Sequence, residues 1–296
     1  MHIDLAIVLA GAIVGFAVGL TGMGGGALMT PVLVLLLHVS PGAAVSSDLV
    51  ASVFMKPVGG AVHLRKKTVH LKLVAWLAVG AIPAGFTGAA LLHFLAQGKA
   101  LQSDIKVALG VALLVAVAGL ILRALVGRPQ PTEAAAELPA VKVLPTLAVG
   151  VIGGLIVGMT SVGSGSLMIV ALMFLYPELT GSQLVGTDLV QSIPLVLSAA
   201  LGQIVFGHVQ LGLTLSLILG SLPAVYLGAR LSASAPSGLL RSAIGLMLLL
   251  SGLKLLGLGN VPLAGAAALG LAAVLTVTTV RRRRRAAPAE IPVPAR

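Results

Sequence analysis

The chain has 296 residues, of which 58% are hydrophobic and only 9% are charged. A soluble globular domain carries about 45–50% apolar and about 25% charged residues, so this composition excludes a water-soluble globular protein and indicates an integral membrane protein. There is no cysteine, which excludes disulfides and thiolate sites, and the net charge of +11 owes much to basic runs at 65–67 and 281–285. These runs border apolar stretches and lack interleaved aromatics, as is typical of cytoplasmic topology signals and not of nucleic-acid binding.

Uninterrupted apolar stretches predict an all-α membrane protein, because about 20 residues of helix cross a ~30 Å hydrocarbon core. In chain order they cover residues 3–37, 41–62, 71–95, 104–125, 143–176, 182–206, 210–232, 238–256 and 261–280. The first and the fifth are too long for one simple span and are interrupted by glycines. The polar segment 127–142 is predicted to be a cytoplasmic linker, and a basic cytoplasmic tail at 281–296 follows the last stretch.

The two halves of the chain repeat each other. The segment GFAVGLTGMGGGALM at 15–29 matches GLIVGMTSVGSGSLM at 154–168, with an offset of 139 residues. After a one-residue slip, Asp48 aligns with Asp188. Such self-similarity predicts a first transmembrane repeat at 1–126, a second at 143–257 and one additional transmembrane helix at 258–280.

Lysine and arginine in the short loops predict that the two repeats have opposite orientation. The loop 63–72 carries four basic residues and is expected in the cytoplasm, where such residues are enriched. The matching loop of the second half carries none, and the basic residues lie one loop later, at Arg230 and Arg241. This shift indicates an inverted repeat with a cytoplasmic C-terminus.

Each half opens with a glycine-broken helix, discontinuous or re-entrant. Glycine destabilises a helix interior, and irregular backbone at membrane depth is tolerated only where protein buries it or it lines a cavity. In inverted-repeat transporters, paired broken helices hold the substrate and direct backbone amides at an anion. The predicted substrate-binding residues are Thr21, Gly22, Gly24, Gly25 and Gly26 in the first half, Thr160, Ser161, Gly163, Ser164, Gly165 and Ser166 in the second, and Gln191 as a further donor.

The glycine clusters also fit a packing role and, loosely, a nucleotide-binding motif. As packing residues they would permit close approach of helices, in the small-residue spacing that Gly11, Gly15 and Gly19 also show. The segment 22–27 fits the dinucleotide fingerprint loosely, but that fingerprint requires a preceding strand, and both flanks here are helical in pattern. No cofactor is therefore predicted.

Asp48 and Asp188 occupy matching positions in apolar surroundings, each after a hydroxyl residue, Ser47 or Thr187. A carboxylate inside a span is costly, so it points to proton coupling, gating or cation binding. The alternative is a helix cap near the membrane interface. We predict these four residues to be coupling or gating residues.

Lys56 is grouped with them as a coupling or gating residue, and it occurs in the first half alone, since its counterpart is Val196. It either supplies positive charge to an anion or snorkels toward the basic loop. No nucleophile-base set and no cluster with metal-ligand spacing is visible, so neither catalytic residues nor a metal site are predicted.

The paired glycine-rich segments, the paired Ser/Thr-Asp-Leu motif and the basic terminal run together resemble the TauE/SafE family of sulfite exporters, over about residues 5–257. The resemblance implies an α-helical permease of the cytoplasmic membrane that moves sulfite, sulfoacetate or related sulfur-containing anions, usually outward. It places the family's glycine-rich segments on Gly19, Gly22, Gly24, Gly25 and Gly26, and on Gly158, Gly163 and Gly165. The family's Thr-Asp motif falls on Thr187 and Asp188, whereas the first half has Ser47.

The leading prediction is a secondary transporter, not an enzyme, that exports sulfite or a related oxyanion, with proton coupling. A divalent-cation permease with Asp48 and Asp188 as oxygen ligands is the first alternative, and a membrane-embedded enzyme is the second. The expected partners are the small anion and the lipid bilayer, and helix faces rich in small residues permit a homodimer.

Overall fold

The structure is a computed structural model that describes residues 3–21, 25–95, 101–126, 139–165, 167–231, 237–259, 262–263 and 265. Within these ranges the chain is helical and contains no β-strand, so the predicted all-α class is confirmed. The elements are α1 (Leu5–Thr21), α2 (Gly26–Pro31), the π-helix η1 (Val32–Leu36), α3 (Pro41–Arg65), α4 (Leu71–Leu95), α5 (Leu101–Val126), α6 (Val143–Thr160), α7 (Leu167–Leu175), α8 (Gly181–Phe206), α9 (Leu211–Leu231) and α10 (Ser237–Leu255).

Two of the predicted apolar stretches each contain more than one described helix. The predicted stretch 3–37 contains α1, α2 and η1, and the stretch 143–176 contains α6 and α7. Most of the predicted linker and of the extra helix, and all of the tail 281–296, lie outside the described residues.

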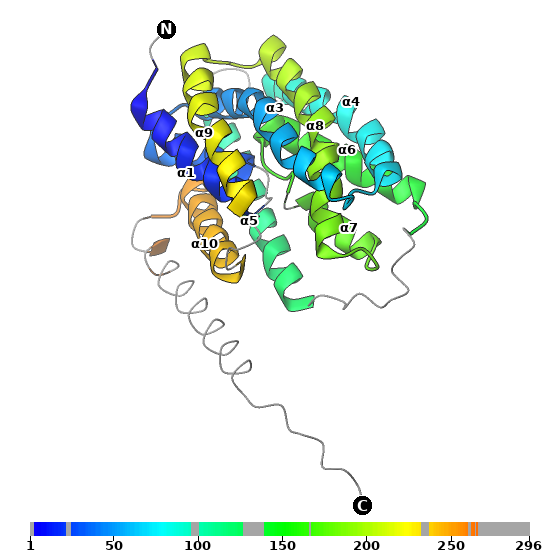
Figure 1. Ribbon diagram of the computed structural model, residues 1–296. Helices are drawn as coiled ribbons and strands as arrows, with labels where there is room; N and C mark the ends of the chain where they lie inside the picture. The colour runs from blue at the N-terminus through cyan, green and yellow to red at the C-terminus, as the bar shows by residue number, and fades with distance from the viewer. Residues whose placement is uncertain are drawn as a thin grey trace, which may run out of the picture.

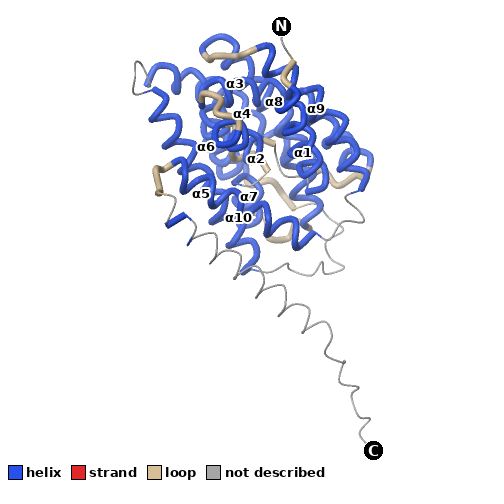
Figure 2. Tube along the Cα trace, turned by 90° about the vertical axis from the view of Figure 1, so that its left-hand side faces the viewer, coloured by secondary structure: helices blue, strands red, loops and turns tan. Residues whose placement is uncertain are grey.

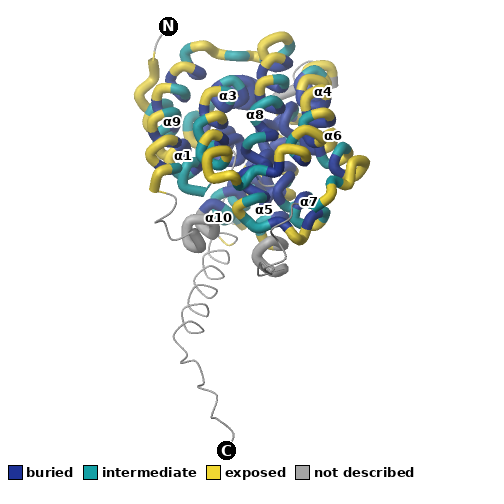
Figure 3. Tube along the Cα trace, turned by 45° about the vertical axis from the view of Figure 1, so that its right-hand side comes forward, coloured by how far each residue is buried: buried dark blue, intermediate teal, exposed yellow. Residues whose placement is uncertain are grey.

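Five of the described helices are long and apolar enough to cross a membrane. Their qualifying segments are Leu71–Phe94, Ser103–Ile121, Val143–Thr160, Gly181–Phe206 and Leu211–Leu231. Large apolar side chains cover the outside of the bundle: Leu144 is 80% exposed and Ile13 is 71% exposed. Figure 3 shows exposed residues along the outer sides of α1, α9, α4 and α6, whereas buried residues gather where α3 and α8 run between them. Exposed apolar side chains on the outer helices suit contact with lipid.

Two helix pairs, α1 with α9 and α4 with α6, pack through glycines (Figure 1). A Cβ added at Gly15 would lie 2.7 Å from the carbonyl oxygen of Ser221, and one at Gly154 would lie 2.7 Å from that of Ala81. The backbones can approach this closely because no side chain intervenes. Close packing therefore explains the glycines of α1, and since α9 covers that face, a homodimer would have to use another surface.

Helices α3 and α8 lie between these pairs and run antiparallel. Near one end the Ser46 hydroxyl donates to Gln203 Oε1 at 2.8 Å, and near the other a Cβ added at Gly60 would lie 2.9 Å from Ile193 Cδ1. In this register Asp48 lies level with the C-terminal part of α8, and Asp188 lies level with the C-terminal part of α3. At a rise of 1.5 Å per residue, the two aspartates are about 20 Å apart along the helix pair. The two matching aspartates therefore lie toward opposite ends of the pair.

The hydroxyl that precedes each aspartate anchors the start of a helix in the other half. Ser47 Oγ accepts the backbone N–H of Gln210 at 3.3 Å, just before α9. Thr187 Oγ1 accepts the backbone N–H of His70 at 3.0 Å, just before α4. Backbone groups at helix ends lack partners within their own helix, so these bonds stabilise the two helix starts.

Candidate functional site

The two glycine-rich segments lie at changes of helix inside the protein. Helix α1 ends at Thr21 and α2 begins at Gly26, and α6 ends at Thr160 and α7 begins at Leu167. Figure 2 shows irregular backbone in the interior of the bundle, beside α2. Irregular backbone in this position is buried by protein, the condition under which a membrane protein tolerates it.

The backbone after α6 adopts conformations that favour glycine. Ser161 ends α6 in the left-handed region with φ 59°, and Gly163 and Gly165 have φ of 125° and 90°. A side chain other than glycine is strained at such angles. The two glycines therefore allow the chain to turn sharply between α6 and α7.

The two glycine-rich segments touch each other. A Cβ added at Gly26 would lie 2.6 Å from both the carbonyl carbon and the hydroxyl oxygen of Ser161. No side chain fits there, so the glycine at the start of α2 permits contact with the end of α6. The structure thus brings together two predicted site segments that are separated by 135 residues in the sequence.

Asp48 lies at this junction. Its Oδ2 accepts hydrogen bonds from the hydroxyls of Thr30 at 3.0 Å and Ser161 at 2.8 Å. The carboxylate is completely buried, and among the described residues its Oδ1 has no hydrogen-bond partner. Because Asp48 lies two turns into α3, which begins at Pro41, the interpretation as an interfacial helix cap is wrong.

Lys56 reaches the same region from the same helix. Its Nζ donates to Ser164 Oγ at 2.6 Å, and both residues are buried. The snorkelling interpretation is therefore wrong, because the ammonium group points into the protein and not toward the basic loop. Two buried carboxylates, Asp48 and Asp188, lie on the same pair of helices as Lys56.

The described donor to Asp188 is an amide, whereas those to Asp48 are hydroxyls. The side-chain amide of Gln191 donates to Asp188 Oδ1 at 3.2 Å and also contacts the sulfur of Met168 in α7. Among the described residues the amide oxygen of Gln191 has no partner. The predicted donor Gln191 therefore serves the carboxylate, and the two halves of the site differ in chemistry although their sequences match.

Several predicted site residues have partners in their own segment. The Thr21 hydroxyl donates to the carbonyl of Ala17, and the Thr160 hydroxyl donates to that of Ile156. The predicted residues Gly22, Gly24 and Ser166 lie outside the described residues.

Thr30 is a site residue that the sequence interpretation missed. It is fully buried in α2 and donates to Asp48. Its counterpart in the second half is Ile169, so the repeat does not single it out. A hydroxyl in an otherwise apolar run is the only sequence signal.

The alternative in which Asp48 and Asp188 ligate one divalent ion is inconsistent with the antiparallel register. Calcium–oxygen and magnesium–oxygen distances are about 2.0–2.6 Å, whereas the register places the two aspartates about 20 Å apart along the helices. In the part of the chain that the structure describes, no three His, Asp or Glu residues gather as metal ligands.

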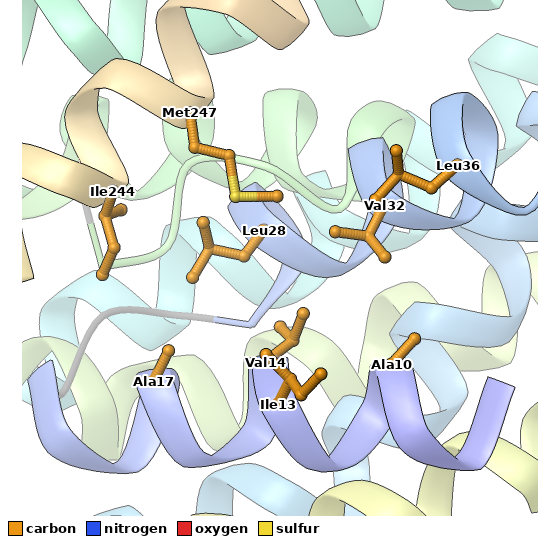
Figure 4. Close-up of a pocket in the computed structure, with 9 residues that line it drawn as sticks. All are labelled: Ala10, Ile13, Val14, Ala17, Leu28, Val32, Leu36, Ile244 and Met247. Atoms are coloured by element: carbon orange, nitrogen blue, oxygen red, sulfur yellow. The ribbon is translucent and has the colours of Figure 1, made fainter. Parts of the chain in front are cut away.

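A separate cavity of about 310 Å³ lies between α1, the α2–η1 segment and α10. Figure 4 shows that its walls carry apolar side chains alone. The residues are Ala10, Ile13, Val14, Ala17, Leu28, Val32, Leu36, Ile244 and Met247. A cavity without polar groups does not compensate the desolvation of an anion, so it is not the candidate site.

Comparison with known proteins agrees with this description. The model of the sulfite exporter TauE/SafE family matches residues 7–255. The chain is 39% identical over 255 residues to the probable membrane transporter protein YjnA of Bacillus subtilis, covering 86% of this chain and 100% of that protein. It is 26% identical over 262 residues to the probable membrane transporter protein YdhB of the same organism, covering 85% and 100%. No solved structure matches the chain.

Proposed function

The chain belongs to the TauE/SafE family of sulfite exporters and is a membrane transporter, and from this we propose that it exports sulfite or a related small sulfur-containing oxyanion or organosulfonate across the cytoplasmic membrane. The contact between Gly26 and Ser161 carries the proposal. It joins two irregular, glycine-rich segments deep in an apolar protein. The Ser164 hydroxyl and the backbone amides of these segments are donors of the kind that a small oxyanion requires.

We infer an inverted repeat, with the C-terminus in the cytoplasm. Reciprocal packing supports it: α1 of the first half pairs with α9 of the second, and α6 of the second pairs with α4 of the first. Two hydrogen bonds between the halves are also equivalent: the N–H of Gln210 donates to Ser47, and the N–H of His70 donates to Thr187. Thr187 follows Ser47 by 140 residues, and Gln210 follows His70 by the same number. A two-fold relation between the halves accounts for both patterns.

In this proposal residues 21–26 and 160–166 hold the anion between them. Asp48 and Asp188, one toward each end of the α3–α8 pair, carry protons or gate access from the two sides. The burial of both carboxylates supports this role, because an ionisable group in a membrane interior is costly unless it is used.

The test is efflux of radiolabelled sulfite from proteoliposomes with an imposed pH gradient. Saturable efflux that follows the gradient supports the proposal. Transport of Co²⁺ but not of any sulfur oxyanion would overturn it.

Gly25 offers a variant that tests the location of the site. A Cβ at Gly25 would lie 3.5 Å from Met55 Cε and 3.9 Å from Ser52 Oγ, which is ordinary contact, so Gly25→Ala is expected to be accommodated. We expect the larger side chain of Gly25→Leu to crowd Met55 and Ser52 of α3 and to abolish sulfite efflux. Gly245, whose Cβ would meet nothing within 4 Å, provides Gly245→Leu as the control. Normal efflux by a correctly folded Gly25→Leu protein would refute this location.

A further inference from the structure

Lys56 is a buried cation whose described hydrogen-bond partner is neutral. Its side chain is 6% exposed, and its ammonium group donates to the Ser164 hydroxyl, which is itself 4% exposed. A charge in an apolar interior is stable only when an opposite charge lies close to it. A hydroxyl fixes the position of the ammonium group but does not neutralise it.

Two buried carboxylates lie on either side of Lys56 along the α3–α8 pair. Asp48 precedes it by two turns of α3, and Asp188 lies beyond it along the antiparallel pair. The Lys56 ammonium group thus lies between two buried carboxylates along the helix pair, and its described hydrogen-bond acceptor is the Ser164 hydroxyl.

Lys56 lies beside the glycine-rich segments of both halves. Ser52 and Met55 share its face of α3, and both lie beside the position where a side chain of Gly25 would be. The second half lacks this arrangement, because Lys56 aligns with Val196 and Ser164 aligns with Gly25. Lys56 and Ser164 thus form a single charged position, to which each half of the chain contributes one residue.

We propose that the Lys56 ammonium and the Ser164 hydroxyl bind the transported anion directly, and that they select small oxyanions with one negative charge. This inference rests on the proposed transport function. One ammonium group balances one negative charge. A second charge on the ligand would meet no further lysine or arginine among the buried described residues.

Methanesulfonate and sulfate test the charge selection, because they share a tetrahedral SO₃ group and differ by one charge. Their binding is measured by the thermal shift of the full chain in detergent and by inhibition of sulfite efflux. We expect methanesulfonate to bind more tightly than sulfate by about tenfold or more, the effect of unit charges at short range in a protein interior. Equal binding of the two anions, or tighter binding of sulfate, would overturn the selection for one charge.

Lys56→Met and Lys56→Arg test the residue itself. We expect Lys56→Met to lose the thermal shift by methanesulfonate and Lys56→Arg to retain it, because arginine keeps the charge. Lys142→Met is the matched control, since Lys142 is exposed and its ammonium donates to the carbonyl of Leu175. For the hydroxyl, Ser164→Ala is expected to weaken binding, whereas Ser192→Ala is not, because the Ser192 hydroxyl donates to the Leu189 carbonyl in its own helix.

The melting temperature of the ligand-free protein separates a binding role from a structural one. An isolated ionised group is costly to bury in an apolar interior, and an apolar side chain of similar length does not carry that cost. We therefore expect Lys56→Met to melt at the same or a higher temperature than the parent protein. A lower melting temperature together with unchanged methanesulfonate binding would show that Lys56 is structural.

The two proposals fail in different ways. If the parent protein moves sulfite and Lys56→Met moves it with the same KM, the role of Lys56 is wrong and the transport function stands. If the parent protein moves no sulfur oxyanion, the transport function is wrong, and the thermal shifts still decide whether Lys56 binds a monovalent anion.

Discussion

Replacing Thr30 by valine removes one hydroxyl from the junction of α2, α3 and the end of α6 while keeping the shape of the side chain. Thr30 Oγ1 donates to Asp48 Oδ2 at 3.0 Å in a fully buried setting. A hydrogen bond to a charged group contributes about 1.5–3 kcal/mol to stability. We expect Thr30→Val to lower the free energy of unfolding by that amount, because Ser161 is then the sole described donor to this carboxylate.

Thr214→Val is the matched control. The Thr214 hydroxyl is buried but donates to the carbonyl of Gln210 in the adjacent turn, and a bond between neutral groups contributes about 0.5–1.5 kcal/mol. The assay is reversible unfolding in mixed detergent micelles, for each variant alone and with Asp48→Asn. A coupling free energy of about 0.5–3 kcal/mol is expected between Thr30→Val and Asp48→Asn, since the two side chains are in contact. Equal losses for both threonines, or no coupling, would refute the assignment of Thr30 to the carboxylate.

Two further outcomes follow from the packing. Gly154→Ala forces a Cβ to within 2.7 Å of the Ala81 carbonyl oxygen, so we expect a loss of about 1–3 kcal/mol in unfolding free energy. A Cβ at Gly245 meets nothing within 4 Å, so Gly245→Ala should raise the free energy of unfolding by about 0.5–1 kcal/mol. If both variants changed the free energy of unfolding in the same direction, the α4–α6 contact would be contradicted. Thr187→Val leaves the buried N–H of His70 without this acceptor, and we expect a loss of about 1–3 kcal/mol by the same unfolding assay. An unchanged stability with an altered pH dependence of efflux would instead assign Thr187 to coupling.

The positions of helices along the chain could be predicted from the sequence because hydropathy is a local property. The predicted stretch 71–95 is the helix α4, and 182–206 differs from α8 by one residue at its start. Gly163 and Gly165 adopt positive φ after α6, a backbone conformation that glycine favours. These features depend on residues that are close together in the chain.

The position of the Lys56 side chain could not be predicted from the sequence in the same way. Its sequence context, near a basic loop, favours snorkelling as much as an internal role. The structure places Ser164 next to its ammonium group, 108 residues away in the sequence. The rotation of α3 about its axis decides whether the Lys56 side chain reaches the basic loop or the protein interior. Packing of α3 against the other helices determines that rotation.

The amino-acid sequence alone specifies a membrane protein with two matching halves, paired glycine-rich segments and paired aspartates, because composition, hydropathy and repetition are properties of the chain itself. The tertiary structure decides which of these residues meet. The antiparallel register of α3 and α8 separates Asp48 from Asp188, and the contact of Gly26 with Ser161 brings Thr30 and Ser161 to the Asp48 carboxylate. Distances between segments follow from helix packing, in which backbones approach only where glycines leave room.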